Sequence, residues 1–391
     1  MRINLGEKQS GLTWAAFRAA LFILVIAAMT RSNSLFAQDN SLAFHRAEHL
    51  RRGINLSHWF AQVFDPKGYT KEHFDTYDTA QDMALIKSMG FDHVRFTLNN
   101  EPMFRRGQAD RIPADYLAMV DAAVKMILDQ GLAVVIDIHP ESDFKARLAA
   151  DDGVVEQFED YWRALARHYS TLDPGRVFFE VLNEPEFKDR YRWEGVQMRL
   201  ARAIREGAPN HTIIVAGANW SSITELIFME PLRDSNVIYN FHFYEPHIFT
   251  HQGATWSTNF QHYLSKLPYP STPENVQAAM AQALDAVNQQ TILHYGLDRW
   301  NAERVDAEIA VAAAWGKRWH VPLTCNEFGV YREAAAPEAR ATWIHDVRTA
   351  LEKYGIGWTM WDYAGGFSVV VSKDGARAAD DVTLKALGLG K

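Results

Sequence analysis

The sequence contains little of what several common kinds of protein need. Its single cysteine, Cys325, excludes an internal disulfide and a metal cluster held by several thiolates. Basic residues form no block, and 40 of them stand against 48 acidic residues, so a nucleic-acid partner is not expected. There is also no glycine-rich phosphate loop, no metal-ligand spacing and no Gly-x-Ser-x-Gly motif. We therefore expect no cofactor and no bound metal.

Apolar residues are what the sequence has in quantity. They make up 48% of the chain, against 23% for charged residues. This composition supports a large packed core and excludes a disordered or low-complexity protein. No linker, internal repeat or change in composition divides the chain. We therefore expect one domain over residues 38–391, and nothing in the sequence demands more than a monomer.

The first 37 residues have the pattern of an export signal. Arg2, Lys8 and Arg18 come before an apolar run at residues 19–29, and the small residue Ala37 suits a cleavage site. The apolar run is about half the length that a helix needs to cross a bilayer. We expect cleavage after Ala37, no membrane span in the processed chain, and a secreted or periplasmic protein.

Short β-branched and aromatic runs alternate with longer stretches of helical period, which is typical of β/α units with a parallel sheet. Eight runs are expected as strands, at 52–56, 91–98, 132–139, 177–183, 212–218, 236–244, 322–328 and 355–362. Amphipathic runs between them are expected as helices, at 114–130, 154–169, 193–206, 304–319 and 338–354. Eight strands with interposed helices predict an α/β protein that forms a single (β/α)8 TIM barrel.

The connections between these elements differ in length. Those that lead from a helix to the next strand are short, whereas those that follow strands are long, at 57–78, 99–113, 140–153 and 245–273. In a barrel of this kind, the loops after the strands lie together on the C-terminal face, where active sites are built. The sequence therefore predicts an active site on that face.

Two carboxylates at strand ends are candidates for the chemistry. Glu184 ends the fourth expected strand, and Glu327 ends the seventh. A pair of carboxylates across a cleft suits glycosidic cleavage, because one protonates the leaving oxygen while the other attacks the anomeric carbon or activates water. Glu101 is a rival for the first role, because the tripeptide Asn-Glu-Pro occurs both at 100–102 and at 183–185.

Two longer motifs carry a resemblance to a known family. One is His242-x-Tyr244 followed by Phe-Thr-His-Gln-Gly-Ala-x-Trp at 249–256, and the other is Glu-Phe-Gly-x-Tyr-Arg at 327–332. Together with the strand-end carboxylates, they resemble glycoside hydrolase family 5, and especially its bacterial endo-β-1,4-glucanases, over residues 50–385. The resemblance implies a retaining double displacement, with Glu184 as general acid/base and Glu327 as nucleophile.

The resemblance also implies how residues around this pair act. Arg95 would keep Glu327 ionised, and Tyr244 would orient the same carboxylate. His242 would lie near Glu184.

Further residues are expected to contact the sugar. Asn183 would hold the 2-hydroxyl of the sugar under attack, His139 would hydrogen-bond the same sugar, and Trp361 would be its floor. The expected substrate-binding residues are Arg95, His139, Asn183, His242, Tyr244, Trp361, His251, Trp256, His58 and Trp59. Two sites depart from the family, since relatives often have two histidines where this chain has His139-Pro140, and Asn where it has His58-Trp59.

Three other expectations concern residues beside the site. Asp137 is expected to be a buried structural acid that the backbone or Arg95 satisfies. Strand alternation places Cys325 on the same face as Glu327, so Cys325 is expected one layer deeper in the barrel. Four histidines lie within residues 242–262, but their spacing matches no zinc pattern.

The function that these observations favour is hydrolysis of internal bonds in a β-1,4-linked glucan. Another β-glycan, such as mannan, xyloglucan or a β-1,3-glucan, is an alternative within the same family. A non-catalytic glycan-binding barrel is an alternative of a different class, although a binder has no reason to keep both carboxylates. The expected partner is in each case a β-linked polysaccharide or oligosaccharide.

Overall fold

The computed structural model of the protein describes residues 40–104, 108, 111–256 and 260–390. The expected export signal, residues 1–37, lies outside them. The chain divides into two compact units by its contacts. One unit comprises residues 1–39 and 233–235, of which only the loop 233–235 is described. The other unit comprises residues 40–232 and 236–391 and contains every helix and strand named below.

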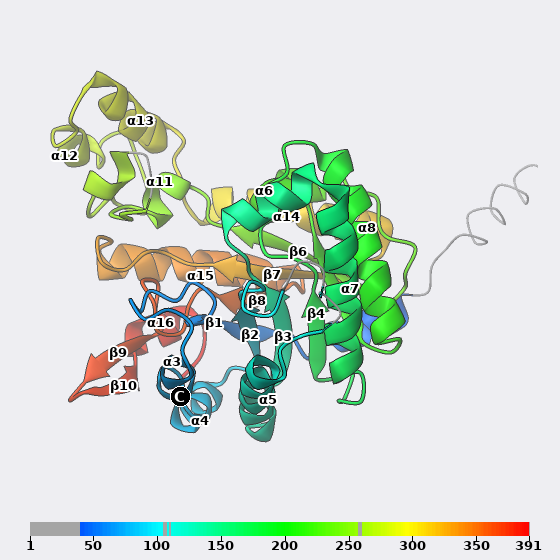
Figure 1. Ribbon diagram of the computed structural model, residues 1–391. Helices are drawn as coiled ribbons and strands as arrows, with labels where there is room; N and C mark the ends of the chain where they lie inside the picture. The colour runs from blue at the N-terminus through cyan, green and yellow to red at the C-terminus, as the bar shows by residue number, and fades with distance from the viewer. Residues whose placement is uncertain (1–39, 105–107, 109–110, 257–259, 391) are drawn as a thin grey trace, which may run out of the picture. The chain divides into compact units, whose positions relative to one another are not determined.

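Eight parallel strands close into a barrel in the order of the sequence (Figure 1). They are β1 (Arg52–Phe60), β2 (His93–Leu98), β3 (Ala133–Ile138), β4 (Val177–Glu180), β5 (Thr212–Ala216), β6 (Val237–Phe243), β7 (Leu323–Phe328) and β8 (Gly357–Met360). Closure is complete because β1 pairs with both β2 and β8. This confirms the predicted (β/α)8 TIM barrel.

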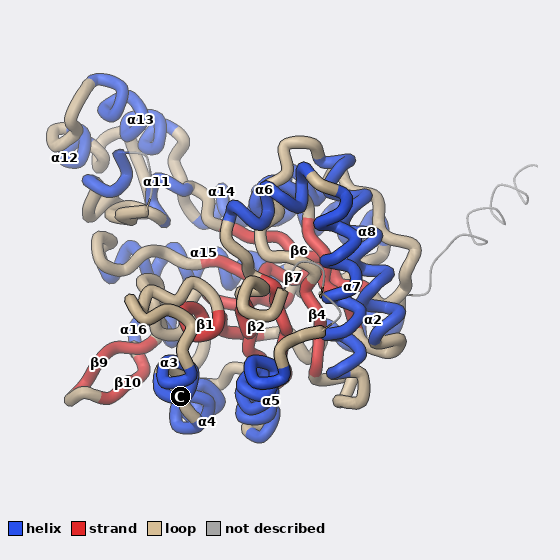
Figure 2. The backbone as a smooth tube through the Cα atoms, viewed as in Figure 1, coloured by secondary structure: helices blue, strands red, loops and turns tan. Residues whose placement is uncertain are grey.

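The helices that follow most strands surround this barrel (Figure 2). They are α4 (Ala80–Met89), α5 (Ala114–Asp129), α6 (Ser142–Ala150), α7 (Asp152–Tyr169), α8 (Arg190–Gly207), α14 (Ala302–Trp319) and α15 (Pro337–Lys353). The five helices predicted from the sequence are present, with ends within three residues of those expected. After β5 there are only the short turns α9 (Ala218–Ser221) and α10 (Ile223–Leu226).

Several shorter elements lie outside this repeating pattern and were not predicted. The connection from β6 to α14 contains α11 (His247–Thr250), η1 (Phe260–Tyr263), α12 (Gln277–Met280) and α13 (Ala286–Leu297). The others are α2 (Ser41–Ala47), α3 (Lys71–Thr76), the hairpin of β9 (Val370–Lys373) and β10 (Ala376–Ala379), and α16 (Asp381–Ala386). The sequence signal is weak here because most of these elements span seven residues or fewer.

The helix ends follow from local sequence. The side chain of Asn301 accepts a hydrogen bond from the backbone of Arg304 and begins α14, and Asp151 caps α7 in the same way through Gly153. At the other end of α4, Gly90 has φ of 100°, a left-handed conformation that favours glycine. The short connection at Gly90 brings the chain back to the N-terminal end of β2.

The interior of the barrel changes character along its axis. At the N-terminal end it is apolar and contains Leu50, Ala133, Val135, Phe178, Ile214 and Ile238. Nearer the C-terminal end, the inward-facing side chains are polar or charged and fully buried: Asn55, Arg95, Asp137, Glu180, Asn240 and Asn326. The apolar end therefore packs the barrel, whereas the polar end supports the face on which the active site was predicted.

The sequence analysis expected Trp59 on the rim, but its side chain lies in the core. Its side chain is 1% exposed, packs against Phe60 and Phe96, and donates from Nε1 to the carbonyl of Phe74 at 2.8 Å. The reason is a break in strand alternation, since His58 has φ of 62° and the pairing of β1 with β2 shifts between Leu56 and Phe60. The prediction that Trp59 contacts substrate is therefore wrong.

The expected position of Cys325 is also wrong, for a related reason. The pairing of β6 with β7 shifts by one residue, so that Phe241 pairs with Cys325 but His242 pairs with Glu327. Asn326 therefore points into the barrel, where it donates to Glu180. Cys325 belongs to the apolar cluster between strands and helices and does not lie beneath Glu327.

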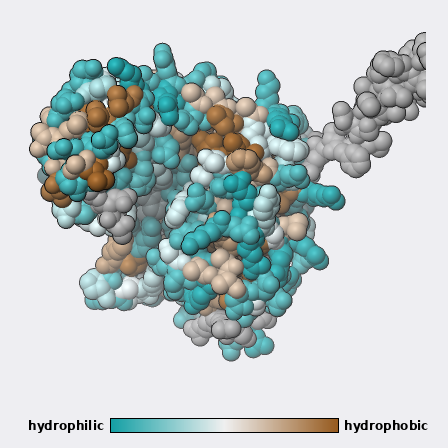
Figure 3. All heavy atoms as spheres, turned by 90° about the horizontal axis from the view of Figure 1, so that it is seen from above, coloured by the Kyte–Doolittle hydropathy of each residue, from teal (hydrophilic) through white to brown (hydrophobic). Residues whose placement is uncertain are grey.

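The face of the molecule seen in Figure 3 is mostly hydrophilic, with apolar residues gathered in small patches. Within the described residues, no helix is both long enough and apolar enough to cross a membrane.

Candidate active site

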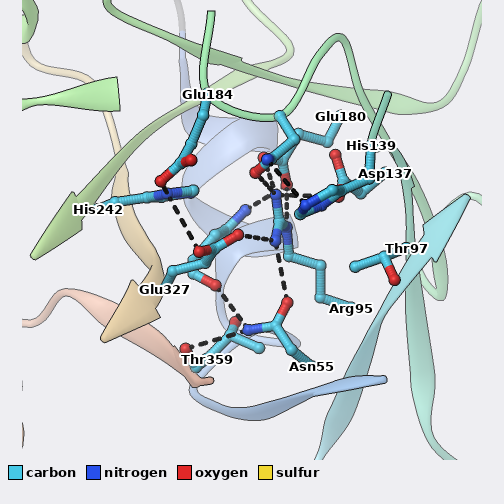
Figure 4. A network of polar contacts seen from close by, with 12 residues as sticks. Asn55, Arg95, Thr97, Asp137, His139, Glu180, Glu184, His242, Glu327 and Thr359 are labelled. Carbon is cyan, nitrogen blue, oxygen red and sulfur yellow. Dashed lines mark hydrogen bonds and ion pairs between the residues drawn. The ribbon is translucent and has the colours of Figure 1, made fainter. Parts of the chain in front are cut away.

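Arg95 on β2 is the centre of a network of polar contacts at the C-terminal end of the barrel (Figure 4). Its guanidinium bonds both carboxylate oxygens of Glu180 at 2.9 Å and one oxygen of Glu327 at 2.7 Å, and lies 3.0 Å from Asp137. It also donates to Asn55 and Asn183. Burial alone would lower the pKa of Arg95, but the three carboxylates raise it well above its usual value, so Arg95 stays charged.

Glu180 is a buried acid that the sequence analysis missed, because only residues at strand ends were considered. Besides Arg95, it accepts hydrogen bonds from Asn240 at 3.2 Å and Asn326 at 2.6 Å. Burial raises the pKa of Glu180, and it raises the pKa of Asp137 to about 6. A signal was present in the sequence, since each of these two acids interrupts an apolar run, at 134–138 and at 177–182.

Glu327 at the end of β7 is held by a donor on each carboxylate oxygen. Arg95 Nη1 bonds Oε1 at 2.7 Å, and the hydroxyl of Tyr244 donates to Oε2 at 3.0 Å. Burial and then the nearby carboxylates raise the pKa of Tyr244 well above its usual value, so its hydroxyl keeps its proton. Both contacts predicted for Glu327 are present, and they hold its carboxyl group in one orientation.

Glu184 lies in the loop after β4, with φ of 42°, and its side chain is 24% exposed. Its Oε1 is 3.0 Å from Nδ1 of His242, the neighbour that the sequence analysis predicted. Burial raises the pKa of Glu184, and the charge of Lys145 partly opposes this effect. Arg95 donates a hydrogen bond to Glu327, whereas the partner of Glu184 is His242. The two carboxyl groups therefore have unlike surroundings.

An oxygen of Glu184 and an oxygen of Glu327 lie within 4.8 Å of each other and of His242 Nδ1. Among the described residues, these three side chains are the one group close enough to share a metal ion. Burial lowers the pKa of His242 to about 4, so the ring is neutral near pH 7. A proton on Nδ1 is donated to Glu184 at 3.0 Å, and the same nitrogen lies 3.5 Å from Glu327. His247 and His251 stand apart from the group, with their rings stacked 3.8 Å from each other.

His139, Asn183 and Trp361 come together beside this pair. Asn183 Nδ2 lies 3.0 Å from His139 Nε2, and His139 Nδ1 lies 3.0 Å from Asp137. The ring of His139 also stacks on Trp361, with centroids 5.5 Å apart and planes at 20°. Both ring nitrogens of His139 therefore have protein partners, which leaves neither free for the sugar contact expected of it. Asp137 is buried and paired with Arg95, as expected.

The remaining predicted residues form the outer rim. His251 packs its ring 5.0 Å from that of Tyr244, and Trp256 lies farther out, 59% exposed and edge-on to Tyr331. His58 lies 3.8 Å from Asp362, the residue after Trp361, and bonds the carbonyl of Gln62. These three predicted residues are thus on the same face as the carboxylate pair, unlike Trp59.

Glu101, the rival acid, has a different environment. It lies on the surface and pairs with Arg147 at 3.0 Å, with both side chains about half exposed. Nothing brings it to the network around Arg95. The tripeptide repeated in the sequence therefore serves two different structural purposes.

Comparison with known proteins gives a consistent set of relatives. The family model described as "Cellulase (glycosyl hydrolase family 5)" matches residues 58–366. Endoglucanase C of Acetivibrio thermocellus is 30% identical over 319 residues, which cover 80% of this chain and 91% of that protein.

Solved structures agree with this likeness. Cel5A of Thermotoga maritima in complex with cellobiose is 25% identical, with a TM-score of 0.71 over 88% of this chain and 99% of that chain. The complex of the same enzyme with mannotriose is also 25% identical, with a TM-score of 0.70 over the same shares. The similarity therefore includes the whole barrel.

The pKa of Glu184 is expected to depend on the charge of Lys145. Lys145 is buried, pairs with Glu186 at 3.1 Å, and its charge lowers the pKa of Glu184. We expect Lys145→Met to raise the pKa of Glu184, because burial would then act with less opposition. Carboxyl-carbon NMR titration of the two proteins measures this change.

The matched control is Lys188→Met, which removes an exposed lysine from the loop that carries Glu184. Solvent screens that charge, so the titration of Glu184 should stay where it is. An unchanged or lower pKa in Lys145→Met would contradict the assignment.

Proposed function

The chain belongs to glycosyl hydrolase family 5, the cellulase family, and is an O-glycosyl hydrolase of the endoglucanase type; we propose that it cleaves internal β-1,4 bonds of a glucan with retention of configuration. In this proposal Glu184 is the general acid/base and Glu327 is the nucleophile. The observation that carries it is the carboxylate pair, with oxygens within 4.8 Å and unlike surroundings. Oxygens this close favour a retaining enzyme, whose carboxyl groups lie about 5 to 5.5 Å apart, over an inverting one, whose carboxyl groups lie about 6.5 to 9.5 Å apart.

The first step needs a protonated Glu184 and an ionised Glu327. The carboxyl proton of Glu184 moves to the glycosidic oxygen while Glu327 attacks the anomeric carbon, so the glycosidic bond breaks and a glycosyl ester forms. Burial raises the pKa of Glu184 and so favours its protonated form. Arg95 and Tyr244 hold Glu327 by both oxygens, which supports its role as the attacking group.

The second step reverses these roles. Glu184, now a carboxylate, takes a proton from water, the water oxygen bonds to the anomeric carbon, and the ester bond to Glu327 breaks. His242 lies 3.0 Å from Glu184 and is neutral near pH 7, so it supports either charge state of Glu184 without competing for the proton.

The substrate contacts follow from the same geometry. We assign the floor under the reacting sugar to Trp361, which stacks on His139, and the outer sugar contacts to His251, Trp256 and His58. Asn183 lies beside both Arg95 and His139, which supports its predicted contact with the 2-hydroxyl. Trp59 has no part in this assignment because it is buried.

A second candidate substrate is a β-mannan. The complexes of Thermotoga maritima Cel5A with cellobiose and with mannotriose are equally similar to this chain in identity. The loops after β1 and β6, which differ most from a minimal barrel, are where the choice between these glycans would be made.

The retaining mechanism predicts the anomer of the first product. Hydrolysis of a soluble β-glucan should release the β-anomer first, because two displacements at one carbon restore its configuration. Proton NMR within the first minutes, before mutarotation, distinguishes the anomers. Early appearance of the α-anomer would rule out the roles given to Glu184 and Glu327.

The proposed substrate and nucleophile are tested together. Purified residues 38–391 should release short oligosaccharides from carboxymethylcellulose and barley β-glucan, and less from mannan, laminarin and xyloglucan. Glu327→Ala should lower this activity by on the order of 10⁴- to 10⁶-fold, as when another enzyme loses a group of its catalytic unit.

The control for this variant is Glu101→Ala. Glu101 stands in the other copy of the Asn-Glu-Pro tripeptide that contains Glu184, but it lies on the surface. It should keep wild-type activity, while circular dichroism should show that Glu327→Ala remains folded. Silence of the wild type on every polymer would favour the binding-only alternative.

We also propose export with cleavage after Ala37, as the first residues of the sequence indicate. The full-length chain expressed in a Gram-negative host should yield protein in the periplasm or medium that begins at Gln38. N-terminal sequencing checks this, and Ala37→Leu, which removes the small residue at the site, should slow processing. An intact N-terminus on the exported protein would contradict it.

A further inference from the structure

Asp137, His139 and Asn183 form a chain of hydrogen bonds from the barrel interior to the reaction site. One end is Asp137 Oδ2, 3.0 Å from His139 Nδ1, and the other is Asn183 Nδ2, 3.0 Å from His139 Nε2. All three residues are at most 5% exposed. These hydrogen bonds therefore lie inside the protein, where an unpaired donor or acceptor is costly.

Arg95 determines which group donates and which accepts in each of these hydrogen bonds. Arginine can only donate, so the atom of Asn183 that lies 2.9 Å from Arg95 Nη2 must be the carbonyl oxygen Oδ1. The amide nitrogen of Asn183 then faces His139, and Nε2 of His139 must accept. The proton of the neutral ring is therefore on Nδ1, where it is donated to Asp137.

This assignment limits what each group can offer a sugar. His139 has one nitrogen occupied by Asp137 and the other by Asn183, and its ring lies flat against Trp361. Asn183 has two amide hydrogens, of which His139 takes one. A single N–H of Asn183 remains for a ligand.

We propose that Asp137 is a positioning residue for the hydrolysis, because it holds His139 in the Nδ1–H tautomer and so leaves Asn183 with one amide hydrogen for the 2-hydroxyl of the reacting sugar. The inference rests on the proposed function of the Glu184–Glu327 pair. In the opposite tautomer, Nε2–H of His139 would meet the amide N–H of Asn183 at 3.0 Å, and one of the two would have to turn away. Asp137 prevents this because its Oδ2 accepts the proton of His139 Nδ1.

The role as an acceptor is tested with two variants. Asp137→Leu keeps the volume but removes the acceptor, whereas the carbonyl oxygen of Asp137→Asn can still accept from His139 Nδ1. The substrates are an aryl β-cellobioside and its analogue that lacks the 2-hydroxyl on the ring next to the aryl group. Contacts to this hydroxyl strengthen in the transition state, so kcat should respond more than KM.

For the first substrate, Asp137→Leu should lower kcat/KM by about 10²- to 10³-fold, the usual effect of losing one transition-state donor. For the analogue the loss should be less than about fivefold, because the contact is already absent. Asp137→Asn should stay within about tenfold of the wild type on both. Equal losses for the two substrates in Asp137→Leu would overturn the proposal.

A matched control separates the effect from loss of any buried acid. Asp362 is also fully buried beside the site, but it bonds Ser57 and the backbone of Phe367, with no contact to His139. Whatever activity Asp362→Leu loses should be lost equally on the two substrates. A selective loss in this variant would overturn the role assigned to Asp137.

A spectroscopic test stands independently of activity. Long-range nitrogen NMR of the wild type should show His139 with its proton on Nδ1, and Asp137→Asn should keep that tautomer. A proton on Nε2 in the wild type would overturn the inference even if the enzyme cleaves cellulose. An inactive wild type with Nδ1–H would instead refute the proposed function and leave the tautomer assignment in place.

Discussion

The buried guanidinium of Arg95 is the constraint on which the C-terminal end of the barrel depends. Moving such an ion out of water costs several kcal/mol, which is recovered only if it is paired and hydrogen-bonded. Here the partners are Asp137, Glu180 and Glu327, from three different strands. Their backbones are therefore fixed relative to one cation, and the nucleophile proposed for catalysis is one of them.

The same network holds more carboxyl groups than cations inside the barrel. Three carboxylates surround one guanidinium, and burial raises the pKa of both Asp137 and Glu180. Asparagines add donors where cations are missing, since Asn240 and Asn326 both bond Glu180. The stability of the barrel must come largely from its apolar end and from the packing between strands and helices, because the polar end is arranged to hold charges in place.

Much of the fold was predictable from the sequence because its signals are local. The eight strands and five of the seven helices around the barrel follow from hydrophobic periodicity, and both carboxylates of the proposed pair lie at or shortly after a strand end. What failed were inferences that assumed regular strands. A left-handed residue at His58 turns Trp59 into the core, and a bulge in β7 turns Asn326 inward in place of Cys325. Such irregularities are frequent at the rims of barrels and next to active sites, and no local hydrophobic pattern records them.

The sequence by itself determined the class of fold, the face that carries the site, and the residue types available for acid/base and nucleophilic chemistry. Only the tertiary structure decided how these residues act on one another. It placed Glu180, the last residue of β4, against Arg95, sent Glu101 to the surface, and engaged both nitrogens of His139 within the protein. The physical reason is that charge and proton positions depend on distances of about 3 Å between residues far apart in sequence, and only the folded chain sets these distances.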